Sequence, residues 1–96
     1  MEILLVVRRR TEAFTEEQFA ALLEPEAEML RTLYAEGIVR FAWSRGDVLG
    51  ACLMMERDSI EEAQTAFARL PLMAAGMLEA QFIPLRGYRG FGPRAT

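Results

Sequence analysis

The first seven residues, Met1–Val7, are apolar at every position except Glu2. Successive side chains of a strand point to opposite faces of its sheet, so this run forms a strand with two apolar faces. Val48–Glu56 has the same character. An antiparallel sheet with one face in water normally alternates apolar and polar residues. The chain must therefore build a sheet whose two faces are both covered.

Helical patterns between the strands set the order of the elements. Thr15 with Gln18, and Ser59 with Glu62, have capping-box spacing at two helix starts, and Gly37 is typical of the position after a helix end. The expected elements are strand 1–7, helix 15–36, strand 38–44, strand 48–56, helix 60–70 and strand 78–85. This βαββαβ order predicts an α+β, ferredoxin-like fold with two helices on one face of an antiparallel sheet.

Several local features refine this outline. Pro25 lies inside the first helix and is expected to kink or divide it, because proline removes a backbone hydrogen bond. In strand 38–44, alternation predicts that Val39, Phe41 and Trp43 share one face. The sequence 45–47 predicts a hairpin turn, and residues 73–77 a connection without helix. We expect one domain over residues 1–86 and a glycine- and arginine-rich tail over residues 87–96.

Two helices cover only one face of such a sheet, so the other face remains apolar and exposed. Large exposed apolar patches mark interaction surfaces. The simplest solution is a second copy of the chain related by twofold symmetry. We therefore expect self-association through this face as a dimeric α+β barrel, with the possibility of a larger assembly left open.

Composition excludes several classes of function. The chain has 96 residues, a net charge of −3, no histidine and one cysteine, Cys52. These values argue against a nucleic-acid binder, an internal disulfide and a metal site based on histidine or cysteine. No segment has the apolar length of a membrane-spanning helix, and the first residues lack the form of a signal peptide. We expect a cytoplasmic protein with no membrane, metal or nucleic-acid partner.

Glu26 occupies a position where leucine would be expected. The apolar positions at helical spacing around it are Phe19, Leu22, Leu23, Met29, Leu30 and Leu33. A buried carboxyl group must be paired, or its pKa must rise so that it is neutral. One interpretation is structural, with Glu26 at the edge of the stripe or paired with an arginine. The other is a general acid–base group that exchanges protons near neutral pH.

From Glu26 to Arg86 the chain resembles the muconolactone isomerase family of the dimeric α+β barrel superfamily. The resemblance depends on Glu26, Gly37, Ala42-Trp43, the acidic helix start at 58–62, the Leu-Pro-Leu sequence at 70–72, and Leu85-Arg86. Residues 58–91 are also similar to the YciI-related proteins of the same superfamily. The resemblance implies an isomerase that acts on a small unsaturated lactone acid without a cofactor.

If the resemblance extends to function, Glu26 is the proton shuttle. Arg86 or Arg40 then holds the carboxylate of a small acidic substrate through paired hydrogen bonds, and Trp43 forms a wall of the pocket. Phe41 stands where similar family members carry a histidine, and the catalytic histidine of YciI-like proteins is missing as well. The alternative is therefore a non-catalytic module that binds a small ligand or forms an assembly on the same barrel.

The tail interleaves basic and aromatic residues, at Arg86, Tyr88, Arg89, Phe91 and Arg94. This pattern occurs in proteins that bind single-stranded RNA. The acidic composition of the whole chain favours instead a tail that packs across a subunit boundary.

Overall fold

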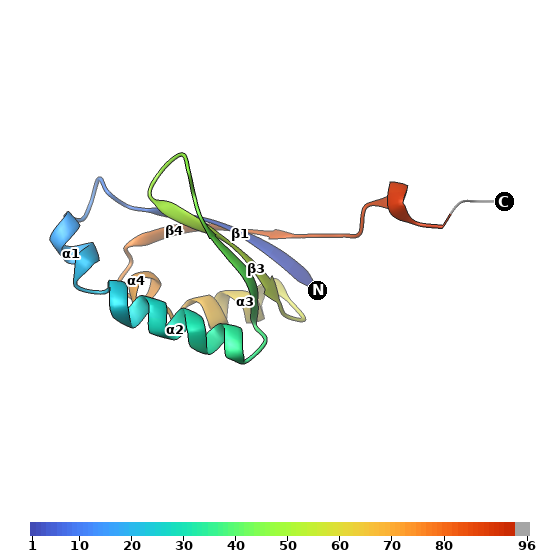
Figure 1. Cartoon of the computed structure of the whole chain (residues 1–96), viewed down its shortest axis with the longest axis horizontal. Coiled ribbons are helices and arrows are strands. Elements are labelled where there is room, and N and C mark those ends of the chain that lie inside the picture. The colour runs from blue at the N-terminus through green and yellow to red at the C-terminus, as the bar shows by residue number, and fades with distance from the viewer. Residues whose placement is uncertain (94–96) are drawn as a thin grey trace.

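The computed structural model describes residues 1–93 and contains a four-stranded antiparallel sheet in the order β2-β3-β1-β4. The strands are β1 (Glu2–Arg9), β2 (Val39–Ser44), β3 (Gly50–Glu56) and β4 (Leu78–Pro84). The helices lie together on one side of this sheet, and the opposite side is bare (Figure 1). The predicted α+β, ferredoxin-like fold is confirmed.

The first helical segment is divided, as Pro25 predicts. It forms α1 (Glu16–Ala20) and α2 (Leu23–Ala35). Pro25 lies in the first turn of α2, where an N–H has no helical partner and proline is tolerated. In a continuous helix the Pro25 ring would collide with the carbonyl of Ala21, four residues earlier. The helix therefore cannot continue from Ala21 through Pro25. The break therefore comes before the proline, and it places Glu26 in the first turn of a new helix.

The helix ends follow the sequence signals closely. Thr15 and Gln18 form the complete capping box. Gly37 adopts φ +79°, and the N–H groups of Gly37 and Ile38 bond back to Tyr34 and Leu33 at 3.0 and 2.9 Å. This is a Schellman ending, which requires a left-handed residue after the helix. The chain therefore leaves α2 in the direction needed to start β2.

The second helical segment departs from the expectation for residues 73–77. After α3 (Ile60–Phe67) the chain forms a short helix, α4 (Pro71–Ala74), where the sequence predicted a non-helical connection. Pro71 is the first residue of α4, and Gly76, with φ +72°, follows its end. The same proline that stops α3 is suited to start α4, because its missing N–H is not needed there.

The core lies between the sheet and the helices. Ile3, Leu5 and Val7 alternate along β1 on the helix side and are at most 3% exposed. They pack in one cluster with Leu33 of α2 and Phe67 of α3. Within residues 1–93 no helix combines the length and apolar character needed to cross a membrane.

The prediction that Val39 shares a face with Phe41 and Trp43 is wrong. The β2–β3 register shifts between Val39, opposite Met55, and Phe41, opposite Met54. This irregularity is a β-bulge, in which one extra residue changes the face on which later side chains lie. Val39 is 1% exposed against the helices, whereas Phe41 and Trp43 are 61% and 52% exposed.

The side of the sheet that carries no helix is called here the open face. Its apolar residues are Leu4, Val6, Phe41, Trp43, Cys52, Met54 and Ile83. The Phe41 and Trp43 rings stack on it with centroids 5.7 Å apart. The single chain thus retains an exposed apolar surface, as expected from strands that are apolar on both faces.

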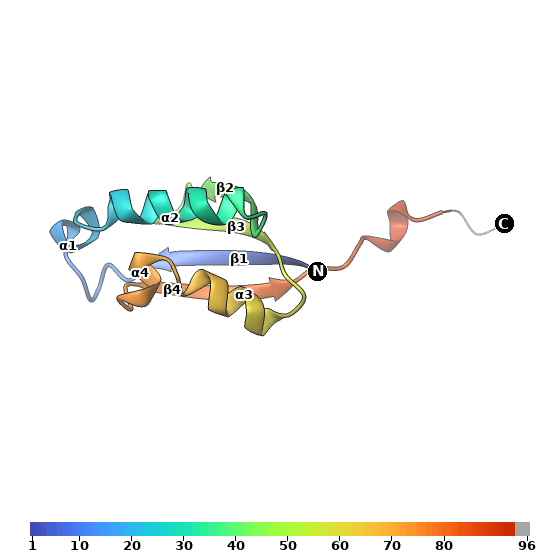
Figure 2. The same cartoon turned by 90° about the horizontal axis from the view of Figure 1, so that it is seen from below.

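The described part of the tail, residues 87–93, runs away from the sheet (Figures 1 and 2). It contains one turn of 3₁₀-helix at Arg89–Phe91. The Tyr88 and Phe91 rings pack edge to face with their centroids 4.9 Å apart, but these residues remain 71% and 89% exposed. Residues 94–96, which include Arg94 of the basic and aromatic pattern, lie outside the described residues.

Candidate functional site

Glu26 projects from the first turn of α2 toward the space between the helices and the sheet, and it is half-buried. Its Oε1 atom accepts a hydrogen bond of 3.0 Å from the backbone N–H of Leu72. Leu72 is the second residue of α4, after Pro71, which has no N–H. No side chain next to α4 in sequence caps this helix. Glu26 therefore supplies the missing acceptor from a distant helix.

The surroundings of Glu26 raise its pKa above the usual value. The main cause is desolvation of the carboxylate by burial, while the Leu72 hydrogen bond and the positive charge of Arg9 act in the opposite direction. Among residues 1–93, the Glu26 side chain makes no other hydrogen bond and no ion pair, so its Oε2 atom is left to accept a proton.

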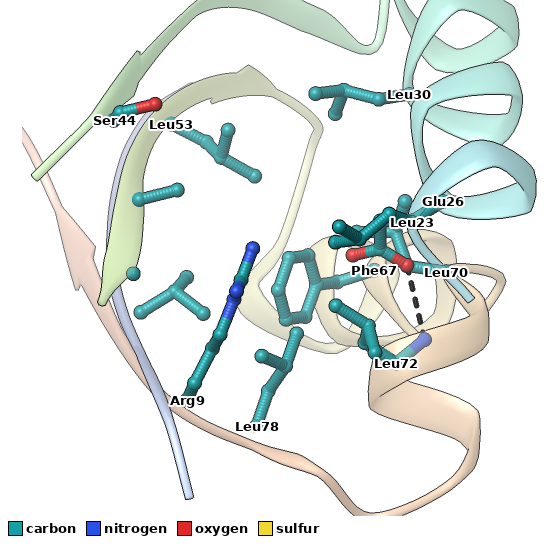
Figure 3. A pocket seen from close by; sticks show the side chains of 13 residues that line it. Arg9, Leu23, Glu26, Leu30, Ser44, Leu53, Phe67, Leu70, Leu72 and Leu78 are labelled. Atoms are coloured by element: carbon teal, nitrogen blue, oxygen red, sulfur yellow. Dashed lines mark hydrogen bonds between the residues drawn. The ribbon is translucent and has the colours of Figure 1, made fainter. Parts of the chain in front are cut away.

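A cavity of about 160 Å³ lies beside the Glu26 carboxylate, as Figure 3 shows. Its wall is mainly apolar, and Arg9, Glu26 and Ser44 are the polar or charged side chains that border it. The remaining lining residues are Val7, Leu23, Leu30, Gly50, Ala51, Leu53, Phe67, Leu70, Leu72 and Leu78. This is the common form of a small-molecule site, an apolar hollow with a few convergent polar groups.

Arg9 enters the same cavity from the sheet. It is the last residue of β1, opposite Leu78 of β4, and alternation places it on the helix side with Val7. Its guanidinium lies over the Phe19 ring, 5.5 Å from the ring centroid. Such cation–π contacts hold a guanidinium in place without consuming its hydrogen-bond donors. Figure 3 shows the Arg9 and Glu26 side chains pointing into one cavity from opposite walls.

The arrangement has the parts needed for proton transfer. Glu26 is a carboxyl group of raised pKa with one oxygen free, Arg9 is a positive charge at the same cavity, and the rest of the wall is mainly apolar. Within residues 1–93, no group of three or more cysteine, aspartate or glutamate side chains is placed to hold a metal ion.

The three residues predicted to bind substrate lie apart from this cavity in a single chain. Arg40 is exposed at the bulge of β2, and it borders a surface hollow next to α2. Trp43 lies on the open face. Arg86 follows β4 at the end of the sheet opposite Arg9, because Leu85 bonds to Glu2 whereas Leu78 pairs with Arg9. Within a single chain, none of these three residues borders the cavity at Glu26.

Two cavity residues were missed at the level of sequence, Arg9 and Ser44. The expected strand 1–7 ends before the three arginines Arg8–Arg10, whereas β1 continues to Arg9. Continuing the alternation of Ile3, Leu5 and Val7 by one step would have placed Arg9 on the buried face. For Ser44 no comparable signal exists, since its face depends on the bulge in β2.

No protein-family model matches this chain, and no curated protein matches it by sequence. Eight chains of known structure match its fold. One is 5-chloro-2-hydroxyhydroquinone dehydrochlorinase (TftG) from Burkholderia phenoliruptrix AC1100, in complex with 2,5-dihydroxybenzoquinone. The TM-score is 0.65 at 19% identity, over 94% of this chain and 98% of that chain. At this identity, the match shows a common fold.

Proposed function

We propose that this protein is a cofactor-free enzyme of the muconolactone isomerase type, which moves a proton on a small unsaturated lactone or carboxylated ring. Glu26 is the acid–base group. The observation that carries the proposal is the half-buried Glu26 carboxylate of raised pKa, which has one oxygen unoccupied among the described residues and borders an apolar cavity. A carboxyl group whose pKa is raised by burial is suited to acid–base catalysis.

The proposed isomerisation needs no reactant other than the substrate. The Glu26 carboxylate removes a proton from an sp³ ring carbon that is joined to the carbonyl directly or through a C=C bond, and the electron pair of that C–H bond moves into the conjugated system as an enolate. Glu26 then returns the proton to another carbon of the same system. One C–H bond breaks and one forms, so the product is an isomer of the substrate. The positive charge of Arg9 stabilises the enolate, because negative charge develops on the substrate in the transition state.

The structural neighbour gives independent support for ring chemistry on this fold. TftG is a dehydrochlorinase of a chlorinated hydroquinone and was solved with a small quinone. Removal of hydrogen chloride includes the loss of a proton, which is the same elementary event proposed for Glu26. Because fold alone does not fix function, this support concerns the class of chemistry only.

We further propose that two copies associate through the open face. Its exposed Phe41 and Trp43 would be expensive to leave in water, and a second identical sheet is the simplest cover. In such an assembly, Arg40, Trp43 and Arg86 are available to a site formed with the partner, as the predicted substrate-binding roles require.

The test of the proposal is turnover of muconolactone and related lactones by the purified protein and by Glu26→Gln. Glutamine keeps an acceptor for Leu72 but cannot exchange the proton. We expect turnover by the wild type and a loss of roughly 10²–10⁴-fold in the variant, the usual contribution of general acid–base catalysis. Retention of near-full activity by Glu26→Gln would remove Glu26 from the mechanism.

A second candidate is a non-catalytic module that binds a small ligand. It is favoured by one observation, the hydrogen bond from Leu72, which gives Glu26 a structural role without any chemistry. This candidate predicts ligand binding without turnover by the folded protein. Absence of turnover on every lactone tested, with the protein folded and able to bind a ligand, would make it the better description.

A further inference from the structure

Three consecutive arginines, Arg8–Arg10, lie at and just after the end of β1. Among the described residues, Arg9 is the one of the three whose guanidinium has no hydrogen-bond acceptor. Arg8 bonds to Glu12 and Glu79 at 2.8 and 2.9 Å, and Arg10 bonds to the carbonyl of Gly76 at 2.8 Å. Within residues 1–93 the Arg9 guanidinium donates no hydrogen bond and forms no ion pair. Arg9 nevertheless lies partly buried at the cavity.

Among the described residues the Arg9 guanidinium has no protein acceptor, and its donors remain accessible to a ligand, because no side-chain N or O atom of residues 1–93 is both buried and unpaired. Arginine carries five N–H donors in a rigid fork that matches the two oxygens of a carboxylate. Glu26 is the acidic residue of the same cavity, yet the two side chains are too far apart to form an ion pair. The cavity thus presents a positive group and a proton acceptor on opposite walls, with space between them.

The size of that space limits the ligand. A cavity of about 150 Å³ lined by leucine, isoleucine and phenylalanine holds one benzene molecule. The present cavity of about 160 Å³ has Leu53, Phe67 and Leu78 in its wall and therefore suits a single six-membered or five-membered ring. Arg9 and Leu23 also border an adjacent hollow formed with α1, so the anionic end of a ligand at Arg9 can remain near solvent.

We infer that Arg9 is the anion-binding residue of this cavity, and that its ligand is a single-ring carboxylate bound with the carboxylate at Arg9 and the ring between Arg9 and Glu26. This inference deepens the proposed function, on which it rests for the role of Glu26. It assigns the binding of the carboxylate to Arg9 within one chain, as the alternative to Arg86 or Arg40 in a site formed with a partner.

The test compares two probes of nearly equal shape, benzoate and benzamide, by NMR titration of the full-length protein at pH 7. The wild type should bind benzoate at least about tenfold more tightly than benzamide, because charge-assisted hydrogen bonds are roughly twice as strong as neutral ones. Arg9→Gln should lose this preference. Arg9→Lys keeps the charge without the fork and should retain part of it.

Arg31→Gln is the matched control, since it removes one positive charge from the exposed surface of α2. It should bind both probes as the wild type does. Equal binding of benzoate and benzamide by the wild type, or failure of benzoate to bind, would overturn the inference without requiring any variant to fold. So would wild-type affinity for benzoate in a folded Arg9→Gln protein.

The two proposals fail in different measurements. Glu26→Gln should keep or improve benzoate binding, because it removes a negative charge that faces the ligand, while it lowers turnover by roughly 10²–10⁴-fold. A Glu26→Gln protein that remains active refutes the proposed function but leaves Arg9 as the anion site. An Arg9→Gln protein that binds benzoate normally refutes the present inference but leaves Glu26 as the proton-transfer group.

Discussion

The backbone N–H of Leu72 donates a hydrogen bond to Glu26 across 46 positions of sequence. This contact joins the first turn of α2 to the first turn of α4, where Pro71 leaves Leu72 as an early N–H in need of an acceptor. It connects Glu26 directly to the Leu-Pro-Leu sequence at 70–72. One carboxylate oxygen holds the two helices together, and the other faces the cavity.

Removal of the acceptor at Glu26 should destabilise the protein. In Glu26→Ala the Leu72 N–H loses its partner, and we expect a decrease in the free energy of unfolding of about 1 kcal/mol, the typical cost of a lost helix cap. Glu26→Gln should avoid this cost because its amide oxygen can accept the same bond. Urea denaturation of both variants gives the comparison, with Glu24→Ala, on the exposed side of the same turn, as the control. Equal stability of the two Glu26 variants would show that the bond contributes nothing.

The raised pKa of Glu26 should appear in the pH dependence of stability. A raised pKa in the folded state favours folding below the unfolded value of about 4.3, and this contribution is lost as pH rises through the folded pKa. Glu26→Gln lacks the ionisation. Its free energy of unfolding minus that of the wild type should therefore increase with pH above about 4.3 and then become constant.

The measurement is urea denaturation of both proteins from pH 3.5 to 8. Taking the difference cancels Glu12, Glu36 and Asp47, whose pKa values are lowered by their arginine partners and act with the opposite sign. A difference that stays flat over the whole range would mean that burial does not perturb Glu26.

A charge on the open face should break the proposed dimer. Trp43→Glu places a carboxylate beside Phe41, and we expect the association to weaken by roughly 2 kcal/mol or more, which is about 30-fold, because large aromatic residues dominate interfaces. Sedimentation velocity measures the change. Tyr34→Glu is the control, since Tyr34 is also an exposed aromatic residue but lies on α2. A wild-type protein that sediments as a monomer would refute the association itself.

Deletion of residues 87–96 should reduce the mass or stability of the assembly while the domain stays folded. The described tail exposes Tyr88 and Phe91 away from the sheet, where a second copy can bury them. Light scattering after size-exclusion chromatography gives the mass, and circular dichroism tests the fold. If the deletion instead leaves assembly unchanged and abolishes binding to a single-stranded RNA oligonucleotide, the RNA-binding interpretation of the tail is correct.

Gly50 should not tolerate a side chain. A Cβ atom there would overlap the carbonyl oxygen of Val7 in the neighbouring strand β1. We expect Gly50→Ala to lower the free energy of unfolding by about 1–3 kcal/mol, the range of overpacked cores, and to distort the wall of the cavity. Gly46→Ala in the adjacent turn is the control, since nothing lies within 4 Å of its Cβ position. Thermal unfolding of the two variants gives the answer.

Much of the fold was accessible from local patterns. The capping box at Thr15, the glycine after α2 and the break associated with Pro25 all occur as expected, because each depends on backbone chemistry within a few residues. The short helix α4 was missed although its signals were present, with Pro71 at its start and Gly76 after its end. At four residues it is too short for helical periodicity to reveal.

The faces of β2 show where such patterns fail. Strict alternation predicted Val39 with Phe41, but the extra residue at the bulge reverses the face of every later side chain. Nothing in the sequence around Arg40 marks the bulge. The position of Trp43 on the open face, and of Ser44 at the cavity, could therefore be known only from the register between strands.

By itself the sequence determined the order of the elements, the apolar character of both sheet faces and the inward position of Glu26, since these follow from periodicity along a single segment. The tertiary structure decided which groups meet. Leu72 reaches Glu26 and Arg9 faces it only because α4 and the end of β1 are brought beside α2. Contacts between residues so far apart in sequence depend on strand register and helix placement, which are properties of the whole packed chain.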